Sequence, residues 1–396
     1  MLRAMDDGRL GGNGRGFVTA EDVARRAGVS RSAVSRTFTE GASVSERVRQ
    51  RVLKAAAALG YRVNRLAQGL IHRRSNLVGI LGADLHAPYM AAQVDALSQA
   101  LLREGMQCLL LNAEGMESNI TGLIDRILEF RVRAIVILSG APSSAIAREC
   151  LASGVRLILV NKVVEGARTD AILADNASGA RMAAELLIRS GCRRPAIVSS
   201  GEGTASLVLR SEVASACFRA AGLTPVCWSR GGVSYETGAA AARELLDTHG
   251  VDGAFCVTDL LALGFLDTVR DSGRRVPEDA QVIGFNDIPQ ASWLAYRLTS
   301  IRLPIDVLTQ AVTEAILRAG NRSKPLRKVL PVTLVERATT RPVTNLGKST
   351  PPAVVHGPSA NQPIHAGLRG RPKAAIAAGI RPRRPASGPR PYGRSR

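Results

Sequence analysis

Between about residues 77 and 340, short apolar runs alternate with longer amphipathic ones along the chain. Helix-like segments such as SNITGLIDRILEF and YETGAAAARELLDTHG fill the intervals between apolar runs. Continuous apolar strands that alternate with helices are typical of parallel sheets covered on both faces. The strand-like runs are LVGIL (77–81), QCLLLNA (107–113), AIVILSG (134–140), RLILVNK (156–162), PAIVSSG (195–201), GAFCVTD (253–259) and QVIGFND (281–287).

This part of the chain has more strands than one sheet comfortably holds, and its length of about 265 residues is large for one hydrophobic core. We therefore predict an α/β body of two lobes, each built on a doubly wound parallel sheet. Ligands of such sheets bind at the carboxyl ends of the strands. The cleft between the lobes is accordingly the expected pocket.

The segment 17–63 has a helical pattern instead. Thr19 is a good helix N-cap, and Asp22 follows it by three residues, so a helix should begin near position 20. Gly28 permits a sharp turn, after which Ser30 caps a second helix. The apolar residues expected to face inward in this head are Val23, Ala24, Ala27, Val34, Phe38, Val48, Val52, Ala55 and Leu59.

A third helix is expected to start after Ser45, as another N-cap, and to run to Gly60. Three short helices with a tight turn between the first two predict a helix-turn-helix head. Such a head places its second helix in the major groove of DNA, where arginine can contact guanine and serine can contact a base or a phosphate. The side chains that face outward on that helix are Arg31, Ser32, Ser35 and Arg36.

The distribution of charge supports a polyanionic partner for the two ends of the chain. The net charge is +20, of which residues 1–75 carry +9 and residues 343–396 carry +10. The middle is therefore close to neutral, at +1. The tail is rich in Pro, Gly and Arg without hydrophobic periodicity, which predicts disorder. Its RGRPK stretch (369–373) resembles an AT-hook core, but a nonspecific electrostatic tail is the simpler interpretation.

These patterns divide the chain into five predicted parts. They are a flexible leader (1–16), the helical head (17–63), a linker (64–76), the two-lobed body (77–341) and the basic tail (342–396). Within the body, we predict lobe 1 at about 77–174 and 303–333, and lobe 2 at about 175–302 and 334–341.

Other classes of protein are disfavoured by the sequence. There is no apolar run of membrane-spanning length and no secretory leader, so we expect a cytoplasmic protein with no membrane partner. The six cysteines form no CxxC pair, and we expect packed thiols without metal or cofactor. The sequence contains no GxSxG, HExxH or Walker A motif that would suggest an enzyme. The cysteines are Cys108, Cys150, Cys192, Cys217, Cys227 and Cys256.

Motifs from every part of residues 17–341 are similar to those of one family. The head and linker contain EDVARRAGVS, AVSR and LGY, and the body contains LADN, CVTDLLALG, VIGFND and LVERATTRP. With these motifs the chain resembles the lactose-repressor/purine-repressor (LacI) family of bacterial transcription regulators. The resemblance implies a body like the periplasmic sugar-binding proteins, a homodimer, double-stranded operator DNA as a partner and a small-molecule effector between the lobes. It also implies that the linker forms a hinge helix on the operator.

The resemblance assigns roles in DNA binding by position. Leu70 matches a leucine that wedges into the minor groove, and an apolar wedge of this kind kinks the duplex. Asn64 and Ala67 match the start and the contact face of the hinge helix. The base-reading residues would be Arg31, Ser32 and Arg36, and the phosphate-binding residues would be Ser30, Ser35, Ser45, Tyr61 and Asn64.

Polar residues after the strand ends are the candidate effector contacts. Arg210 matches the effector-binding arginine of the family, and an arginine can bind hydroxyls or a carboxylate. Val233 stands where relatives often stack an aromatic ring on the ligand, so a simple sugar is not assured. Asp259 is expected to be structural, as a cap of the helix that follows it. The candidate effector contacts are Asp84, Tyr89, Asn161, Arg210, Thr258 and Asn286.

The sequence is therefore interpreted as that of a sequence-specific DNA-binding regulator, with repression expected from the family. Three alternatives remain. A solute-binding protein of a transporter would have no use for the head, and an enzyme would need catalytic residues that do not present themselves. An architectural DNA-binding protein, driven by the basic ends, would bind without sequence preference.

Overall fold

The computed structural model describes residues 17–39, 41–63, 75–113, 120–139, 142–318 and 324–343. The predicted leader, nearly all of the linker, and almost the whole tail, including RGRPK, lie outside the described residues.

The head contains three helices, α1 (Ala20–Ala27), α2 (Arg31–Thr37) and α3 (Glu46–Leu59). Their buried core is made of Val23, Ala24, Ala27, Val34, Val52, Ala55 and Ala56, against which Phe38, Val48 and Leu59 pack in part. The prediction of a three-helix head with these inward residues is thereby confirmed.

Local capping explains where the helices of the head begin and turn. Thr19 and Asp22 form a reciprocal capping box at the start of α1. Gly28 ends α1 with φ of +61°, a left-handed conformation that costs glycine little. The Ser30 hydroxyl accepts a hydrogen bond from the amide of Ala33. Ser45 is the N-cap of α3, as predicted, although its side chain makes no capping hydrogen bond.

The body contains two six-stranded sheets. In the first, the order is β11-β5-β4-β3-β1-β2, and all neighbouring strands pair in parallel. Strands β3 and β4 are almost wholly buried, as expected for central strands covered on both faces. The bounds are β1 (Leu77–Gly82), β2 (Gln107–Asn112), β3 (Ala134–Ile137), β4 (Arg156–Val160), β5 (Asp170–Ala174) and β11 (Arg327–Leu330).

The second sheet has the order β12-β10-β9-β8-β6-β7. Its strands are parallel except for β12, which pairs antiparallel with β10 at one edge. The predicted all-parallel sheet therefore needs this correction. The bounds are β6 (Pro195–Ser199), β7 (Val226–Ser229), β8 (Gly253–Cys256), β9 (Gln281–Asn286), β10 (Thr299–Arg302) and β12 (Thr333–Val335).

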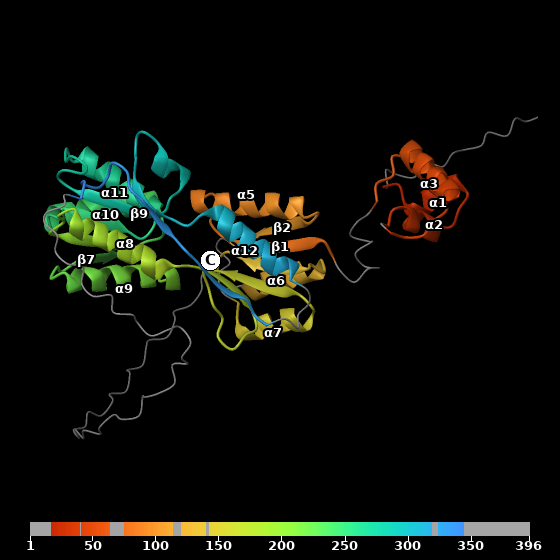
Figure 1. The fold of residues 1–396 in the computed structure, drawn as a ribbon, viewed down its shortest axis with the longest axis horizontal. Coiled ribbons are helices and arrows are strands. Elements are labelled where there is room, and N and C mark those ends of the chain that lie inside the picture. The colour runs from red at the N-terminus through yellow and green to blue at the C-terminus, as the bar shows by residue number, and fades with distance from the viewer. Residues whose placement is uncertain are drawn as a thin grey trace, which may run out of the picture. The chain divides into compact units, whose positions relative to one another are not determined.

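The helices of the body cover the two sheets separately. Helices α5 and α12 run beside each other against the first sheet, while α8, α9, α10 and α11 belong to the second (Figure 1). The bounds are α5 (Pro88–Arg103), α6 (Ile120–Glu129), α7 (Ser144–Ala152), α8 (Asn176–Arg189), α9 (Ala205–Ala220), α10 (Tyr235–Thr248), α11 (Asp259–Asp271) and α12 (Ile305–Leu317), with a short 3-10 helix η2 (Pro289–Ser292).

The chain passes between the two sheets at three places. It leaves the first sheet after β5, returns after β10 through α12 to β11, and then enters the second sheet again as β12. Each sheet is therefore assembled from segments that are distant in sequence. Such multiple crossings allow two lobes to move against each other about a hinge made of strand ends.

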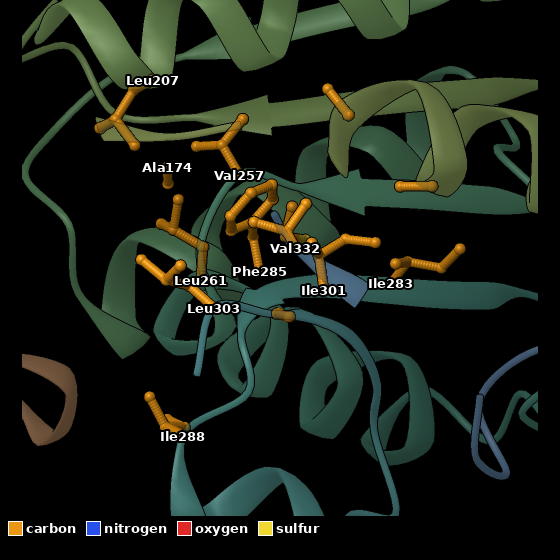
Figure 2. Close-up of a cluster of buried hydrophobic side chains, with 14 of the residues drawn as sticks. Ala174, Leu207, Val257, Leu261, Ile283, Phe285, Ile288, Ile301, Leu303 and Val332 are labelled. Atoms are coloured by element: carbon orange, nitrogen blue, oxygen red, sulfur yellow. The ribbon is translucent and has the colours of Figure 1, made fainter. Parts of the chain in front are cut away.

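The core of the second lobe lies directly beneath the carboxyl ends of its strands. Phe285 of β9 lies near Leu261, Ile301 and Val332 within one cluster of buried side chains (Figure 2). A Cβ added to Gly179 of α8 would lie 2.7 Å from the Phe285 ring, so glycine is what lets this helix approach β9. The packed ring forms a fixed floor for the polar groups described next.

Candidate functional site

Helix α2 presents a polar, basic surface. Arg31, Ser32 and Arg36 are exposed, whereas Val34 on the opposite side is fully buried. The Ser30 and Ser32 hydroxyls are 2.9 Å apart. The Nε of Arg36 donates to the carbonyl of Ser32 over 3.4 Å, which lays the arginine along the exposed face of the helix. This surface has the donors needed to read base edges in a major groove.

The candidate phosphate contacts surround this helix. Ser45 is exposed at the start of α3, and Ser35 is half-buried on α2. Tyr61 packs its ring against Phe38, with ring centroids 5.6 Å apart. Burial raises the pKa of Tyr61, and nearby Arg31 opposes the rise, which places these two predicted contacts close together.

Sequence reasoning missed one residue that shapes the head. Arg51 of α3 donates from one guanidinium nitrogen to the carbonyls of Ala27 and Gly28. It thereby fixes the turn between α1 and α2 from a position 23 residues away in sequence. Asn64, Ala67 and Leu70, the predicted hinge contacts, lie outside the described residues.

A cavity of about 280 Å³ lies between the lobes. Tyr89 of α5 lines it from the first lobe and Asn286 of β9 lines it from the second, so two of the predicted effector contacts meet there. Its volume is just below the range typical of small-molecule sites, about 300–1,000 Å³. The full lining is Tyr89, Ala92, Asn286, Asp287, Ile288, Pro289, Ser292, Arg302, Ile305 and Arg337.

Arg210 is held rigidly inside the second lobe. It is 5% exposed. Its Nε donates to the side-chain oxygen of Asn176 over 2.8 Å, and its Nη1 donates to the carbonyl of Val257 over 2.7 Å. Its guanidinium carbon lies 3.5 Å from the centroid of the Phe285 ring. Burial lowers the pKa of Arg210 to about 10, so the group stays charged at neutral pH.

Tyr89 of the first lobe lies within electrostatic range of Arg210. Burial raises the pKa of Tyr89 to about 12, while Arg210 acts to lower this pKa and Asp259 acts to raise it. The phenol is therefore a neutral hydroxyl at neutral pH, able to donate and accept hydrogen bonds.

The other predicted contacts have mixed surroundings. Asp84 is exposed after β1, with φ of +50°. The side-chain oxygen of Asn161 accepts from the amide of Ala174 over 2.8 Å and so ties the end of β4 to the end of β5. Thr258 is the N-cap of α11. Asn161 and Thr258 thus use side-chain oxygens to hold the backbone in this structure.

Asp259 is structural, as predicted, but in a different way. The cap of α11 is Thr258, whereas the Asp259 carboxylate accepts hydrogen bonds from the amide of Ile288 and the hydroxyl of Ser300. These bonds fix the turn that follows β9 and carries Asn286 and Asp287. Both residues have positive φ, +114° and +52°, which side chains other than glycine adopt only at a cost.

The burial of Asp259 predicts a pH-dependent stability. Burial raises its pKa to about 7, so the folded state holds the proton more tightly than the unfolded chain does. The associated stabilisation is complete below about pH 4 and is lost as the pH rises to about 7. We expect the unfolding free energy of the wild type, measured relative to Asp259→Asn by urea titration, to fall by a few kcal/mol over this interval.

The same titration of Asp271→Asn serves as the control, because Asp271 is exposed at the end of α11. Its difference from the wild type should change little with pH. A difference between the wild type and Asp259→Asn that is constant from pH 4 to pH 7 would contradict the assignment.

An ion-pair cluster at the cavity was not found from the sequence. Asp287 pairs with Arg302 at 2.5 Å and with Arg337 at 2.7 Å, and all three residues line the cavity. Asp287 and Arg337 belong to the family motifs VIGFND and LVERATTRP. No spacing rule, however, joins positions 50 residues apart.

Two further observations concern the chemistry of the described residues. Within them, no group of three His, Cys, Asp or Glu side chains is placed to hold a metal ion. None of the helices in the described parts of the chain is both long and apolar enough to cross a membrane.

Comparison with known families gives two matches. The model for bacterial regulatory proteins of the lacI family matches residues 19–64. The model for the periplasmic binding protein-like domain matches residues 184–340. The first match covers the helical head, and the second covers the greater part of the second lobe together with α12 and β11.

Curated relatives match over most of their own length. The transcriptional regulator CelR of Thermobifida fusca is 30% identical over 332 residues, which are 81% of this chain and 97% of that protein. The regulator GalS of Salmonella typhimurium is 29% identical over 307 residues, 77% of this chain and 90% of GalS. Both relatives are named as HTH-type transcriptional regulators.

Solved structures are similar as well. The lac repressor dimer bound to operator and the anti-inducer ONPF superposes with a TM-score of 0.74 at 26% identity, covering 83% of this chain and all of that chain. A CelR–cellobiose complex gives a TM-score of 0.59 at 29% identity, covering 81% and 99%.

Proposed function

Because this chain belongs to the LacI family of bacterial regulatory proteins, which are DNA-binding transcriptional regulators, we propose that it represses transcription from a pseudo-palindromic operator. It binds there as a homodimer in the cytoplasm. A small molecule in the cavity between its lobes controls the binding. Residues 17–63 are the DNA-binding head, and residues 77–341 bind the effector and carry the dimer contacts.

The observation that carries the proposal is the exposed face of α2. Arg31, Ser32 and Arg36 are exposed to solvent on a helix whose other side packs into the core of the head. An exposed helix after a tight turn is the arrangement with which helix-turn-helix proteins read a major groove. We assign base reading to these three residues and phosphate contacts to Ser30, Ser35, Ser45, Tyr61 and Asn64.

The linker and the cavity complete the proposed mechanism. Leu70 is assigned to the minor-groove wedge and Ala67 to the contact face of the hinge helix. Effector binding shifts the relative orientation of the lobes, and this shift orders or releases the hinge helices. The two sites are thus coupled through one element that has two states. The effector contacts are Asp84, Tyr89, Asn161, Arg210, Thr258 and Asn286.

Selection of bound sites from a random DNA pool, with the full-length protein at near-physiological salt, tests the proposal. We expect a palindrome with a central pyrimidine–purine step, because such steps kink easily around an apolar wedge. The selected site should bind about 10³-fold or more tightly than bulk DNA. The Arg31→Ala/Arg36→Ala double variant should select no motif. A wild-type pool enriched without any motif would instead indicate an architectural DNA-binding protein.

The proposed homodimer makes a separate prediction about one surface of the second lobe. Trp293 and Leu294 are 54% and 91% exposed, and Trp293 stacks on Tyr296. Tyr235 and Tyr296 both donate to Asp267, which joins α10, α11 and this loop into one patch. The exposed apolar surface suits a second copy of the chain, since the similar lac repressor structure is a dimer.

We expect Leu294→Asp to shift the protein from dimer to monomer at micromolar concentration, as measured by analytical ultracentrifugation. Each leucine that the dimer interface buries contributes about 1.5–3 kcal/mol to the free energy of dimerisation, and each protomer loses one. The charge of the new aspartate, buried in the interface, weakens the dimer further. Val329→Asp, which changes an exposed apolar residue on β11, is the matched control and should remain dimeric. A dimeric Leu294→Asp protein would place the interface elsewhere.

A further inference from the structure

One wall of the cavity between the lobes is strongly polar. Asp287 follows β9 and lies between two arginines, Arg302 at the end of β10 and Arg337 after β12. The Asp287 side chain is only 4% exposed, because both of its oxygens are occupied by these guanidinium groups. The carboxylate is therefore unavailable to hydroxyl groups of a ligand.

The two arginines differ in how many of their donors the protein uses. The Nη1 of Arg337 donates both to Asp287 and to the carbonyl of Leu298, and the side chain is mostly buried. Arg302 donates to Asp287 through Nε, and among the described residues its two terminal nitrogens make no protein hydrogen bond. The side chain of Arg302 is 47% exposed and lines the cavity. Its free end is thus open to a ligand.

The charges on this wall do not balance. Two guanidinium groups face one carboxylate, which leaves one positive charge in excess. Arg210, outside the cavity lining but within electrostatic range of Tyr89, adds a second cation, and its two hydrogen-bond acceptors are the neutral groups of Asn176 and Val257. Asp259 lies within electrostatic range of both Tyr89 and Arg210, but burial raises its pKa to about 7, so its negative charge offsets only part of this excess at neutral pH. An excess of positive charge in a cleft with low-dielectric walls attracts anions.

Neutral hydrogen-bonding groups lie beside the cationic wall. Asn286 reaches the cavity from a backbone with φ of +114°, and Asp259 and Ser300 hold the turn in that conformation. Tyr89 faces the cavity from the first lobe. An amide and a phenol can bind hydroxyl groups, whereas a guanidinium binds a carboxylate or phosphate with two parallel hydrogen bonds.

We propose that the effector of this protein is a small hydroxylated anion, whose carboxylate or phosphate is bound by the free end of Arg302. This inference rests on the proposed function, since it names the chemical class of the effector in the cavity. The hydroxyl groups of the ligand bind to Asn286 and Tyr89. Arg302 then determines specificity, because a neutral sugar leaves its charge without a partner.

Calorimetric titration of the full-length protein with matched ligands tests the proposal. The probes are three sets: glucose, gluconate and glucose 6-phosphate; galactose, galactonate and galactose 6-phosphate; and ribose, ribonate and ribose 5-phosphate. We expect at least one anion to bind at least tenfold more tightly than its neutral parent. The acid and the phosphate ester in each set distinguish the two possible anionic groups.

Variants connect that preference to the residue. Arg302→Gln should reduce the affinity for the anion at least tenfold and change the affinity for the neutral parent much less. Arg302→Lys keeps the charge without the planar fork, and it should restore part of the lost affinity. Arg181→Gln, at an exposed position on α8, removes the same charge from a residue outside the cavity lining and should have no effect. Melting temperatures of all variants report whether they fold.

The outcomes separate this inference from the proposed function. If the protein selects an operator but binds none of the anionic ligands, the anion inference is contradicted and the regulator proposal stays intact. Anion binding that Arg302→Gln does not weaken also contradicts it. A preparation that selects no operator contradicts the proposed function, whatever the ligands do.

Discussion

An Arg36→Ala variant is expected to lose about 1–3 kcal/mol of binding free energy at particular base pairs of the operator, which is a five- to 150-fold loss of affinity. The side chain is exposed on α2, and its position along the helix is supported by the bond from Nε to Ser32. Alanine removes the guanidinium without disturbing the buried side of the helix. Binding to operators substituted one base pair at a time measures the effect.

The way in which the loss of affinity varies with the DNA sequence distinguishes base reading from phosphate binding by Arg36. The loss should be large on the preferred operator and should disappear on operators already substituted at the base pair that Arg36 reads. Arg26→Ala, which removes an exposed arginine of α1, is the matched control, and its effect should not depend on the sequence. An equal loss by Arg36→Ala on random DNA would contradict the assignment.

Replacing Arg210 by methionine is expected to raise the effector concentration needed for half-maximal change in operator binding about a hundredfold. Charged hydrogen bonds contribute about 1.5–3 kcal/mol each, and the arginine is held in place over the ring of Phe285, next to Asn286 of the cavity lining. Operator affinity without effector should remain within about twofold, because the head is a separate part of the chain. Operator binding followed by fluorescence anisotropy, with and without effector, measures both quantities.

A structural role for Arg210 predicts a different result. Methionine leaves the side-chain oxygen of Asn176 and the carbonyl of Val257 without their donor, so some loss of thermal stability is expected in any case. Asn176→Ala removes one positioning contact and keeps the guanidinium, and it should have a smaller effect on the response. If Arg210→Met lowers the melting temperature but leaves the response to effector unchanged, Arg210 holds the fold and does not bind the effector.

The elements that the sequence predicted are those whose pattern is complete within one segment. Strands β3 and β4 are buried on both faces, so their runs are continuously apolar and easily recognised. The caps at Thr19 and Ser30 act within three residues, and both were predicted correctly. Five short strands were missed, namely β5, β7, β10, β11 and β12. Four of them, VCWS, TSIR, RKVL and TLV, have only three or four residues and include polar ones, and β5 (DAILA) is a short apolar run that periodicity alone does not mark as a strand.

The site shows the same division between local and long-range information. The rule that ligands bind at strand ends identified Asn286 and pointed to Tyr89 after the first strand, and both line the cavity. The cluster of Asp287, Arg302 and Arg337 depends on pairing β9 with β10 and β10 with β12. The antiparallel edge strand brings Arg337 back to Asp287, and nothing in the local sequence specifies that return.

The position of the Asp287 cluster has an evolutionary consequence. Arg302 stands where the chain leaves the second sheet for α12, and Arg337 stands just after the chain has returned as β12. The ion pairs that shape the ligand wall therefore also clamp two of the three strands joining the lobes. A descendant that exchanges Arg302 to accept a different metabolite also alters the stiffness of its own pivot. In such a lineage, a new ligand preference and a new equilibrium between the DNA-bound and DNA-released states of the effector-free protein would be inherited together.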